Sequence, residues 1–257
     1  MSAVLPFDEA GEGPAVVLLH AGVADRSTWS EHFPALAGNG NRALAVDLPG
    51  FGAAPESSTP PWVAVLSTMS ELGIDRAVLV GNSLGGAVAL RVAHAAPERV
   101  RALMLISAPP PGLEPSDQLR EAWRTEEEAY DRGDIDGAVG AVVAAWTLPD
   151  APQAIRERIA TAQRRAYEHA AAATVPYEEP PDPLAEGPDA LTRITMPVLA
   201  LAGERDMPDF RDGAVALAAA LPNARHVLIA GAGHLAPLET PEVFRALMLE
   251  WLAELSD

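Results

Sequence analysis

The sequence of 257 residues contains no cysteine. This absence excludes disulfide bonds, thiolate nucleophiles, zinc ribbons and iron–sulfur clusters that depend on cysteine sulfur. Basic residues are also few, because 18 Lys and Arg stand against 36 Asp and Glu, for a formal net charge of −18. Nucleic acids and anionic membrane surfaces need concentrated positive charge, so we expect neither as a partner.

Long apolar runs are missing as well. The run at 138–148 is about half the length that spans a bilayer, and residues 1–6 lack the basic start and the apolar stretch of a secretory signal. Hydrophobic residues nevertheless make up 49% of the chain, enough to bury a large core. We therefore expect a cytoplasmic protein that acts on a small molecule and that could form a homodimer.

Six short apolar segments are continuous rather than alternating, which is typical of strands covered on both faces. They are residues 15–19, 43–47, 77–81, 102–107, 198–202 and 226–230. Amphipathic segments between them predict helices at 61–72, 84–96, 212–221 and 241–255. Thr240 is the expected N-cap of the last helix. This alternation predicts an α/β fold with a mostly parallel central sheet flanked by helices.

One region, residues 108–194, interrupts the alternation. It contains no convincing strand, and proline-rich stretches bound it on both sides. Helical patterns inside it lie near 116–130, 135–148 and 152–174. Because proline ends helices and stiffens connections, we interpret 108–194 as an inserted helical cap and residues 1–107 and 195–257 as the core.

The segment Gly81-Asn82-Ser83-Leu84-Gly85 lies between a predicted buried strand and a predicted helix. At so sharp a turn the serine backbone is strained, and the positions two before and two after it must be nearly free of side chain. Such a turn holds the hydroxyl at the carboxyl edge of the sheet. The pattern Gly-x-Ser-x-Gly in this context predicts that Ser83 is a nucleophile.

Over nearly the whole chain, these features resemble the α/β-hydrolase fold superfamily. The resemblance implies a mostly parallel sheet, helices on both sides and often a helical cap after the sixth strand, the place that 108–194 would take. It also implies a serine esterase or lactonase whose catalytic triad follows the chain order Ser, Asp, His.

A serine hydroxyl needs a base to accept its proton, and that base needs an orienting acid. His234 differs from the other five histidines because it follows a predicted strand through Gly231-Ala232-Gly233 and precedes the last helix. This position lies at the same sheet edge as Ser83. The resemblance implies the same residue, since the family's base stands in a Gly-x-Gly-His segment.

Three carboxylates follow the strand predicted at 198–202: Glu204, Asp206 and Asp209. The family's Gly-x-x-Asp pattern implies Asp206 as the acid, with Asp209 and then Glu204 as alternatives. Some relatives place the acid after the sixth strand instead, but residues 107–108 supply no carboxylate.

Negative charge develops on the substrate carbonyl oxygen, so N–H donors must already surround it. The N–H of Leu84, at a helix N-terminus, is one expected donor. The loop after the strand at 15–19 resembles the family's His-Gly-x loop, whose register makes Gly22 the second donor. Ala21 stands where glycine is usual, so Ala21 or Val23 could take this role instead.

The leading hypothesis is a serine hydrolase that cleaves a carboxylic ester or lactone through an acyl-enzyme intermediate. Hydrolases of C–C bonds in ring-cleavage products share the Asn82-Ser83 pair, but they typically have Gly-Pro-Gly in the oxyanion loop and Trp after the catalytic His. This chain has Val23-Ala24-Asp25 and Leu235 there. A cofactor-free perhydrolase is another alternative, and a non-catalytic small-molecule binding protein is an alternative of a different class.

The substrate is the least determined feature. Trp123 and Trp146, in the insertion, offer flat apolar surfaces that could contact a medium-sized apolar acyl or ring-containing ester, or could pack the cap against the core. The proposed reaction needs no organic cofactor and no metal, and no metal-ligand spacing is seen.

Overall fold

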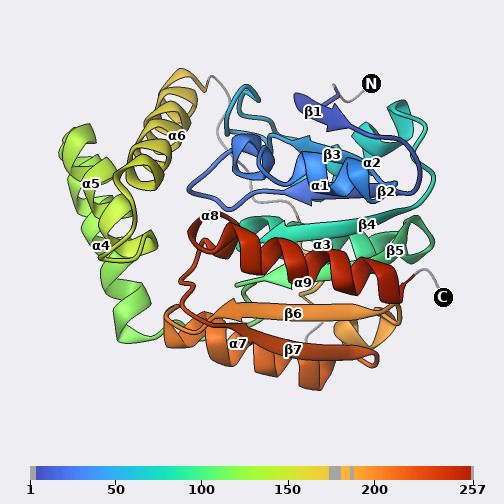
Figure 1. The fold of residues 1–257 in the computed structure, drawn as a ribbon. Coiled ribbons are helices and arrows are strands. Elements are labelled where there is room, and N and C mark those ends of the chain that lie inside the picture. The colour runs from blue at the N-terminus through green and yellow to red at the C-terminus, as the bar shows by residue number, and fades with distance from the viewer. Residues whose placement is uncertain (1–3, 174–180, 186–187, 256–257) are drawn as a thin grey trace.

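The computed structural model describes residues 4–173, 181–185 and 188–255. Its strands form one sheet in the order β1-β3-β2-β4-β5-β6-β7 (Figure 1). The strands are β1 (Phe7–Ala10), β2 (Ala15–Leu19), β3 (Arg42–Val46), β4 (Ala77–Asn82), β5 (Val100–Ile106), β6 (Val198–Gly203) and β7 (Ala224–Ile229). All neighbours are parallel except β1, which is antiparallel to β3. The predicted fold class is therefore confirmed.

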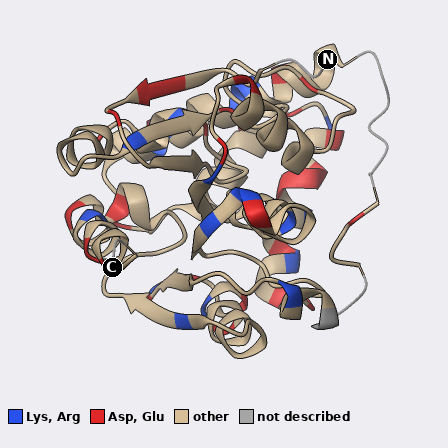
Figure 2. Ribbon diagram, turned by 90° about the vertical axis from the view of Figure 1, so that its right-hand side faces the viewer, with Lys and Arg blue, Asp and Glu red and all other residues tan. Residues whose placement is uncertain are grey.

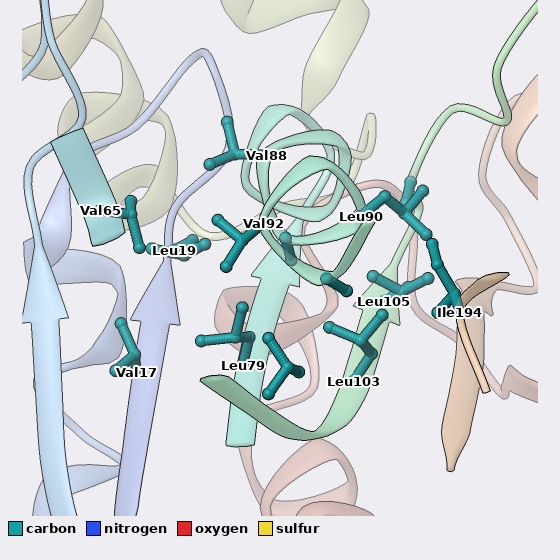
Figure 3. Close-up of a cluster of buried hydrophobic side chains, with 14 of the residues drawn as sticks. Val17, Leu19, Val65, Leu79, Val88, Leu90, Val92, Leu103, Leu105 and Ile194 are labelled. Atoms are coloured by element: carbon teal, nitrogen blue, oxygen red, sulfur yellow. The ribbon is translucent and has the colours of Figure 1, made fainter. Parts of the chain in front are cut away.

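Helices cover both faces of the sheet. One face carries α1 (Phe33–Gly38) and α9 (Pro241–Glu254). The other carries α2 (Pro61–Glu71), α3 (Leu84–Ala95) and α7 (Pro208–Ala220). Figure 3 shows the second layer, where apolar side chains of α3 and of strands β2, β4 and β5 meet. Burial of such apolar area is the main stabilising contribution in folding.

The six predicted strands all form, with ends that differ by at most two residues. Strand β1 has no apolar pattern that would predict it, because Asp8 and Glu9 lie in an exposed antiparallel edge strand rather than in a buried one. The prediction that every strand is covered on both faces is wrong for β7. This strand is the opposite edge of the sheet, and only Ile229 in it is buried.

One predicted helix start and one predicted capping bond need correction, whereas the last helix begins at Pro241 as predicted. Helix α7 begins at Pro208, four residues before the predicted start, since proline is well suited to the first turn of a helix. Thr240 does precede α9, but its hydroxyl donates to the carbonyl of Ala236 at 3.2 Å and does not cap the helix. The short helix α8 (Ala236–Glu239) supplies that carbonyl.

Three helices form a cap-like region: α4 (Asp117–Asp131), α5 (Ile135–Trp146) and α6 (Gln153–Ala172). They lie beyond the carboxyl ends of the parallel strands, at the left of Figure 1. Ser116 caps α4 and Asp134 caps α5, each accepting a backbone N–H of the first turn. Counted within the chain, the region follows the fifth of the seven strands. The division into cap and core domains at 108 and 194 stays a prediction.

Short 3-10 helices connect these elements: η1 (Arg26–Trp29), η2 (Pro97–Arg99) and η3 (Pro188–Arg193). Charged residues of both signs alternate over the side of the molecule seen in Figure 2, and arginines there are dispersed among acidic residues. Among the described residues, no helix is long and apolar enough to cross a bilayer.

Candidate active site

Ser83 stands between β4 and α3 in a strained conformation. Its φ of 52° and ψ of −114° lie in a region that residues with a side chain rarely adopt. The N–H of Ser83 donates to the carbonyl of Ile106 on β5 at 2.7 Å, which secures the turn. A strained serine at the end of a central strand is the geometry predicted for the nucleophile turn.

Gly81 and Gly85 show why this turn needs glycine on both sides. A Cβ on Gly81 would overlap the carbonyl oxygen of Gly85 and would lie 2.5 Å from the N of Gly86. A Cβ on Gly85 would overlap the carbonyl oxygen of Leu19 and would lie 2.7 Å from that of His20. Strand β2 therefore approaches the start of α3 so closely that only glycine fits.

The two predicted oxyanion donors lie on neighbouring segments. The N–H of Leu84 is the first of α3 and so has no partner within the helix. Residues 21–24 form a turn closed by the N–H of Ala24 donating to Ala21 at 3.0 Å. A Cβ built on Gly22, inside this turn, would lie 3.5 Å from the side chain of Leu84. The choice among Ala21, Gly22 and Val23 stays a prediction.

His234 and Asp206 form a hydrogen-bonded pair. The Nδ1 of His234 lies 3.1 Å from Oδ1 and 3.2 Å from Oδ2 of Asp206, and both side chains are buried. The N–H of Met207 donates to Oδ1 at 2.8 Å, and the hydroxyl of Ser107 donates to Oδ2 at 2.6 Å. These bonds hold the carboxylate against the ring, as an orienting acid requires.

The structure separates the three competing carboxylates. Asp209 accepts both the N–H and the hydroxyl of Ser116 at 2.7 Å, so it anchors the start of α4 to α7. Burial acts to raise the pKa of Asp209, but the hydrogen bonds from Ser116 outweigh it and leave that pKa lowered. Glu204 accepts the N–H of Gly231 at 3.2 Å. Asp206 is the carboxylate that contacts the His234 imidazole.

Ser107 is a site residue that sequence reasoning missed. It is completely buried at the end of β5, with a φ of 48°, and its N–H donates to Leu201 on β6 at 2.7 Å. The family pattern points at this position only to a possible carboxylate. Its hydroxyl was the available signal, because it is a donor at the edge of the sheet where the acid was expected.

The side chain of Asn82 joins the nucleophile turn, residues 81–85, to the loop that carries His234, residues 230–235, called the histidine loop below. Its Nδ2 donates to the carbonyls of Ile106 and His234, both at 3.1 Å, and the residue is fully buried. The segments that carry Ser83 and His234 are therefore in direct contact. Within the described part of the chain, no hydrogen bond joins the Ser83 hydroxyl to the His234 ring.

The other histidines close to the sheet edge have different partners. His20 accepts the N–H of Leu48 at its Nε2 (3.0 Å), and its Nδ1 donates to the carbonyl of Ala21 (2.8 Å). Burial lowers the pKa of His20, in keeping with a neutral ring whose two nitrogens are both satisfied. The Nε2 of His32 lies 3.0 Å from the carbonyl of Pro237. These contacts hold both rings in structural positions.

Two aromatic rings lie against the His234 imidazole. The Trp146 ring, from α5 of the cap, is centred 4.6 Å from it, and the Phe210 ring, from α7, is centred 4.3 Å away. Trp123 lies on α4 and is 46% exposed. Phe210 was not predicted, because its helix was expected to start after it.

A further apolar cluster connects the cap to this region. Its buried members come from the loop after β2, the cap helices, α7 and the residue before it, and α8 and the residue before it: Ala21, Ala24, Leu119, Val142, Trp146, Ile159, Met207, Phe210, Leu235 and Leu238. The cluster includes Trp146 and Phe210, the two rings that touch the imidazole. The surroundings of the Asp206–His234 pair are therefore mainly apolar on the cap side.

Comparisons with known proteins agree with this architecture. A model described as the alpha/beta hydrolase family matches residues 16–247. Bifunctional epoxide hydrolase 2 of Sus scrofa is 37% identical over 115 residues, which are 41% of this chain and 20% of the relative. The 2-hydroxy-6-oxo-6-phenylhexa-2,4-dienoate hydrolase of Comamonas testosteroni is 37% identical over 119 residues, 43% of this chain and 41% of the relative. The matches thus span less than half of either relative.

Solved structures match over almost the full length. A thermophilic esterase from Thermogutta terrifontis has a TM-score of 0.80 and 25% identity, covering 98% of this chain and 93% of that one. The enol-lactonase from Burkholderia xenovorans LB400 has a TM-score of 0.78 and 23% identity, covering 97% and 96%. At this level of identity the second likeness shows a shared fold.

Proposed function

We propose that this chain, which belongs to the alpha/beta hydrolase family, is a serine hydrolase that cleaves a carboxylic ester or lactone. In this proposal Ser83 is the nucleophile, His234 the general base and Asp206 the orienting acid. The observation that carries it is the buried contact of the His234 Nδ1 with both oxygens of Asp206. That contact leaves Nε2 as the nitrogen that can accept a proton from serine.

In the first half of the reaction, the Ser83 Oγ attacks the carbonyl carbon while His234 accepts the hydroxyl proton. The tetrahedral oxyanion accepts hydrogen bonds from the N–H groups of Leu84 and Gly22. Collapse of the intermediate breaks the C–O bond to the alcohol, and His234 returns the proton to the leaving oxygen. An acyl group then remains on Ser83.

The second half removes this acyl group. His234 accepts a proton from water, whose oxygen attacks the acyl carbon, and the same oxyanion donors stabilise the new intermediate. The carboxylic acid leaves as His234 protonates the Ser83 Oγ. In this path the hydrogen bond between the serine hydroxyl and the imidazole tightens when substrate is bound.

The surroundings of the base support a neutral, apolar acyl group. Trp146 and Phe210 flank the imidazole, and the apolar cluster extends from them into the cap. Two arginines close in sequence to the predicted acid and to the oxyanion loop are already paired, Arg205 with Asp150 and Arg26 with Asp47. An anionic substrate would therefore bury its charge without a partner, at a large cost.

A C–C bond hydrolase is the second candidate. It is favoured by Asn82-Ser83 and by the match to the dienoate hydrolase of Comamonas testosteroni, whose named substrate carries a carboxylate. The apolar lining favours the neutral ester over that anion. Despite the match to an epoxide hydrolase, we place epoxide chemistry behind both, because the resemblance implies an aspartate nucleophile for it and position 83 is serine.

Two measurements test the proposal. A fluorophosphonate probe should label the wild-type protein at Ser83 and should leave Ser83→Ala unlabelled. A panel of esters and lactones of graded acyl length, with a dienoate ring-cleavage product beside them, should show turnover of the neutral compounds. Turnover of the dienoate alone would support the C–C candidate, and a protein that is neither labelled nor active would be a binding protein.

The proposal also covers the cofactors, partners, localisation and oligomeric state of the protein. The reaction as written uses only residues of the chain and needs neither a metal nor an organic cofactor. Its partner is a small molecule rather than nucleic acid or a membrane. Cytoplasmic localisation and a homodimer stay predictions, which cell fractionation and sedimentation can test.

A further inference from the structure

A single carboxylate, that of Glu239 in α8, connects the histidine loop to the cap. Its Oε2 accepts the N–H groups of Gly233 at 2.8 Å and of Leu235 at 3.2 Å, the two neighbours of His234. Its Oε1 accepts the N–H of Leu148, just beyond the end of α5, at 3.2 Å. One side chain therefore holds both flanks of the histidine and the end of a cap helix.

The cap segment 146–150 makes two further contacts with the same sheet edge. The Trp146 ring lies 4.6 Å from the His234 ring. Asp150 forms an ion pair at 2.8 Å with Arg205, in the loop that carries the predicted acid. Through Trp146 and Asp150, this cap segment thus contacts both loops of the acid–base pair.

Gly233, Leu148 and Glu239 are tightly packed where the cap meets the histidine loop. A Cβ on Gly233 would lie 2.8 Å from the Leu148 side chain and 3.1 Å from the Oε2 of Glu239. Burial raises the pKa of the Glu239 carboxyl, whereas its three N–H donors and the nearby His234 act to lower it. Because three N–H groups converge on its two oxygens, this carboxyl group is a common anchor for the loop and the cap.

We infer that Glu239 is a positioning residue that makes docking of the cap and alignment of the His234 imidazole a single event. The inference rests on the proposed function, in which His234 is the base. The backbone on each side of His234 is held by one carboxylate oxygen, and the cap is held by the other. Displacement of the cap end at Leu148 therefore moves the group that fixes the loop.

Two variants of Glu239 separate its hydrogen bond from Leu148 (the cap arm) from its hydrogen bonds from Gly233 and Leu235 (the loop arm). Glu239→Gln keeps one oxygen, which can still accept from Gly233 and Leu235, and turns an NH₂ donor toward the N–H of Leu148. It therefore breaks the cap arm and keeps the loop arm. Glu239→Ala removes both. Glu242→Gln, an exposed carboxylate in the first turn of α9, is the matched control.

Turnover of a short and a long acyl ester is the first readout. We expect kcat to fall about tenfold in Glu239→Gln and about a hundredfold in Glu239→Ala, since small misplacements of a catalytic group cost this much. KM should change less than about threefold, and the loss should be equal for both esters. A loss confined to the long ester, or wild-type kcat in Glu239→Gln, would overturn the coupling and leave Glu239 a cap contact only.

Hydrogen exchange of the wild-type and variant proteins is the second readout, and it does not depend on hydrolysis. In Glu239→Gln the amide of Leu148 should exchange faster and, because the arms are coupled, those of Gly233 and Leu235 should also exchange faster. Faster exchange at Leu148 alone contradicts the coupling. If the wild-type protein hydrolyses no ester, the proposed function fails, and this measurement still decides whether the cap and the loop are coupled.

Discussion

The nucleophile turn and the cap are held by different kinds of contact. Around Ser83 the close contacts at the two glycines are with backbone atoms, since Gly81 and Gly85 lie where any side chain would overlap a carbonyl oxygen. The cap is attached mainly through side chains, such as Ser116 with Asp209 and Asp150 with Arg205. The turn can therefore change very little, whereas cap attachments can change one at a time.

This difference suggests a division of labour. The groups proposed for the chemistry all come from the sheet and its loops, and the cap contributes the Trp146 ring beside the imidazole. Variants of the sheet edge should therefore abolish the reaction or the fold. Variants of the cap should change stability or substrate range by smaller amounts.

The largest expected effect is at Ser83. Replacement by alanine should lower kcat by roughly a millionfold if the three groups act as a unit, measured with the best ester of the panel. Ser83→Gly should be equally inactive but should melt at a higher temperature than wild type, because glycine relieves the strain at a φ of 52°. If Ser83→Ala or Ser83→Gly retains turnover, Ser83 is not the nucleophile and the proposed mechanism is wrong.

Next in size is a comparison of two aspartates three residues apart. Asp206→Asn should cut kcat by about ten-thousandfold through the wrong histidine tautomer. Asp209→Asn should change kcat less than tenfold and should lower the free energy of unfolding by about 1 kcal/mol, because it weakens the bonds to Ser116. Steady-state kinetics and urea denaturation measure the two effects, and a reversal of their order would reassign the acid.

Substitution of two glycines tests the difference between the nucleophile turn and the cap by its effect on stability. Gly85→Ala should destabilise the protein by about 3 kcal/mol, since the added Cβ would overlap β2. Gly140→Ala in α5 should instead stabilise it by about 0.5–1 kcal/mol, because that position is exposed and a Cβ there meets nothing within 4 Å. Denaturant midpoints measure both, and a tolerated Gly85→Ala would contradict the close approach of β2.

The smallest effect is the pH dependence that His20 confers. Because burial lowers its pKa in the folded state, the unfolded chain binds the proton first as pH falls below about 6.5. The free energy of unfolding should therefore decrease from that pH down through the folded-state pKa, by at most about 1.4 kcal/mol per pH unit for this group. His20→Gln should flatten the slope, and an unchanged slope would show that His20 does not cause it.

Local patterns predicted much of the molecule. Continuous apolar segments and amphipathic segments located six strands and the main helices, because periodicity depends only on the order of residues. Ser83 could be singled out because its turn needs glycine at 81 and 85, both within two residues. The edge strand β1 was missed, since the exposure of Asp8 and Glu9 depends on its place in the sheet.

Contacts between distant segments could not be read in the same way. The hydroxyl of Ser107 and the carboxylate of Asp206 are 99 residues apart, and Glu239 meets Leu148 across 91 residues. Neither pair has a spacing signature, because each depends on which loops the sheet order brings side by side. The two predicted tryptophans show the same limit, since Trp146 lies against His234 and Trp123 is exposed.

The amino-acid order alone determined the α/β class, the helical insertion and the short segments that carry Ser83 and His234, because hydrophobic periodicity and tight turns are local properties. Only the folded sheet decided that Asp206 rather than Asp209 contacts the imidazole. It also decided that Ser107 supports that carboxylate and that Glu239 joins the cap to the histidine loop. The physical reason is that hydrogen bonds require approach to about 3 Å, and the chain achieves this between remote residues only after its strands have aligned.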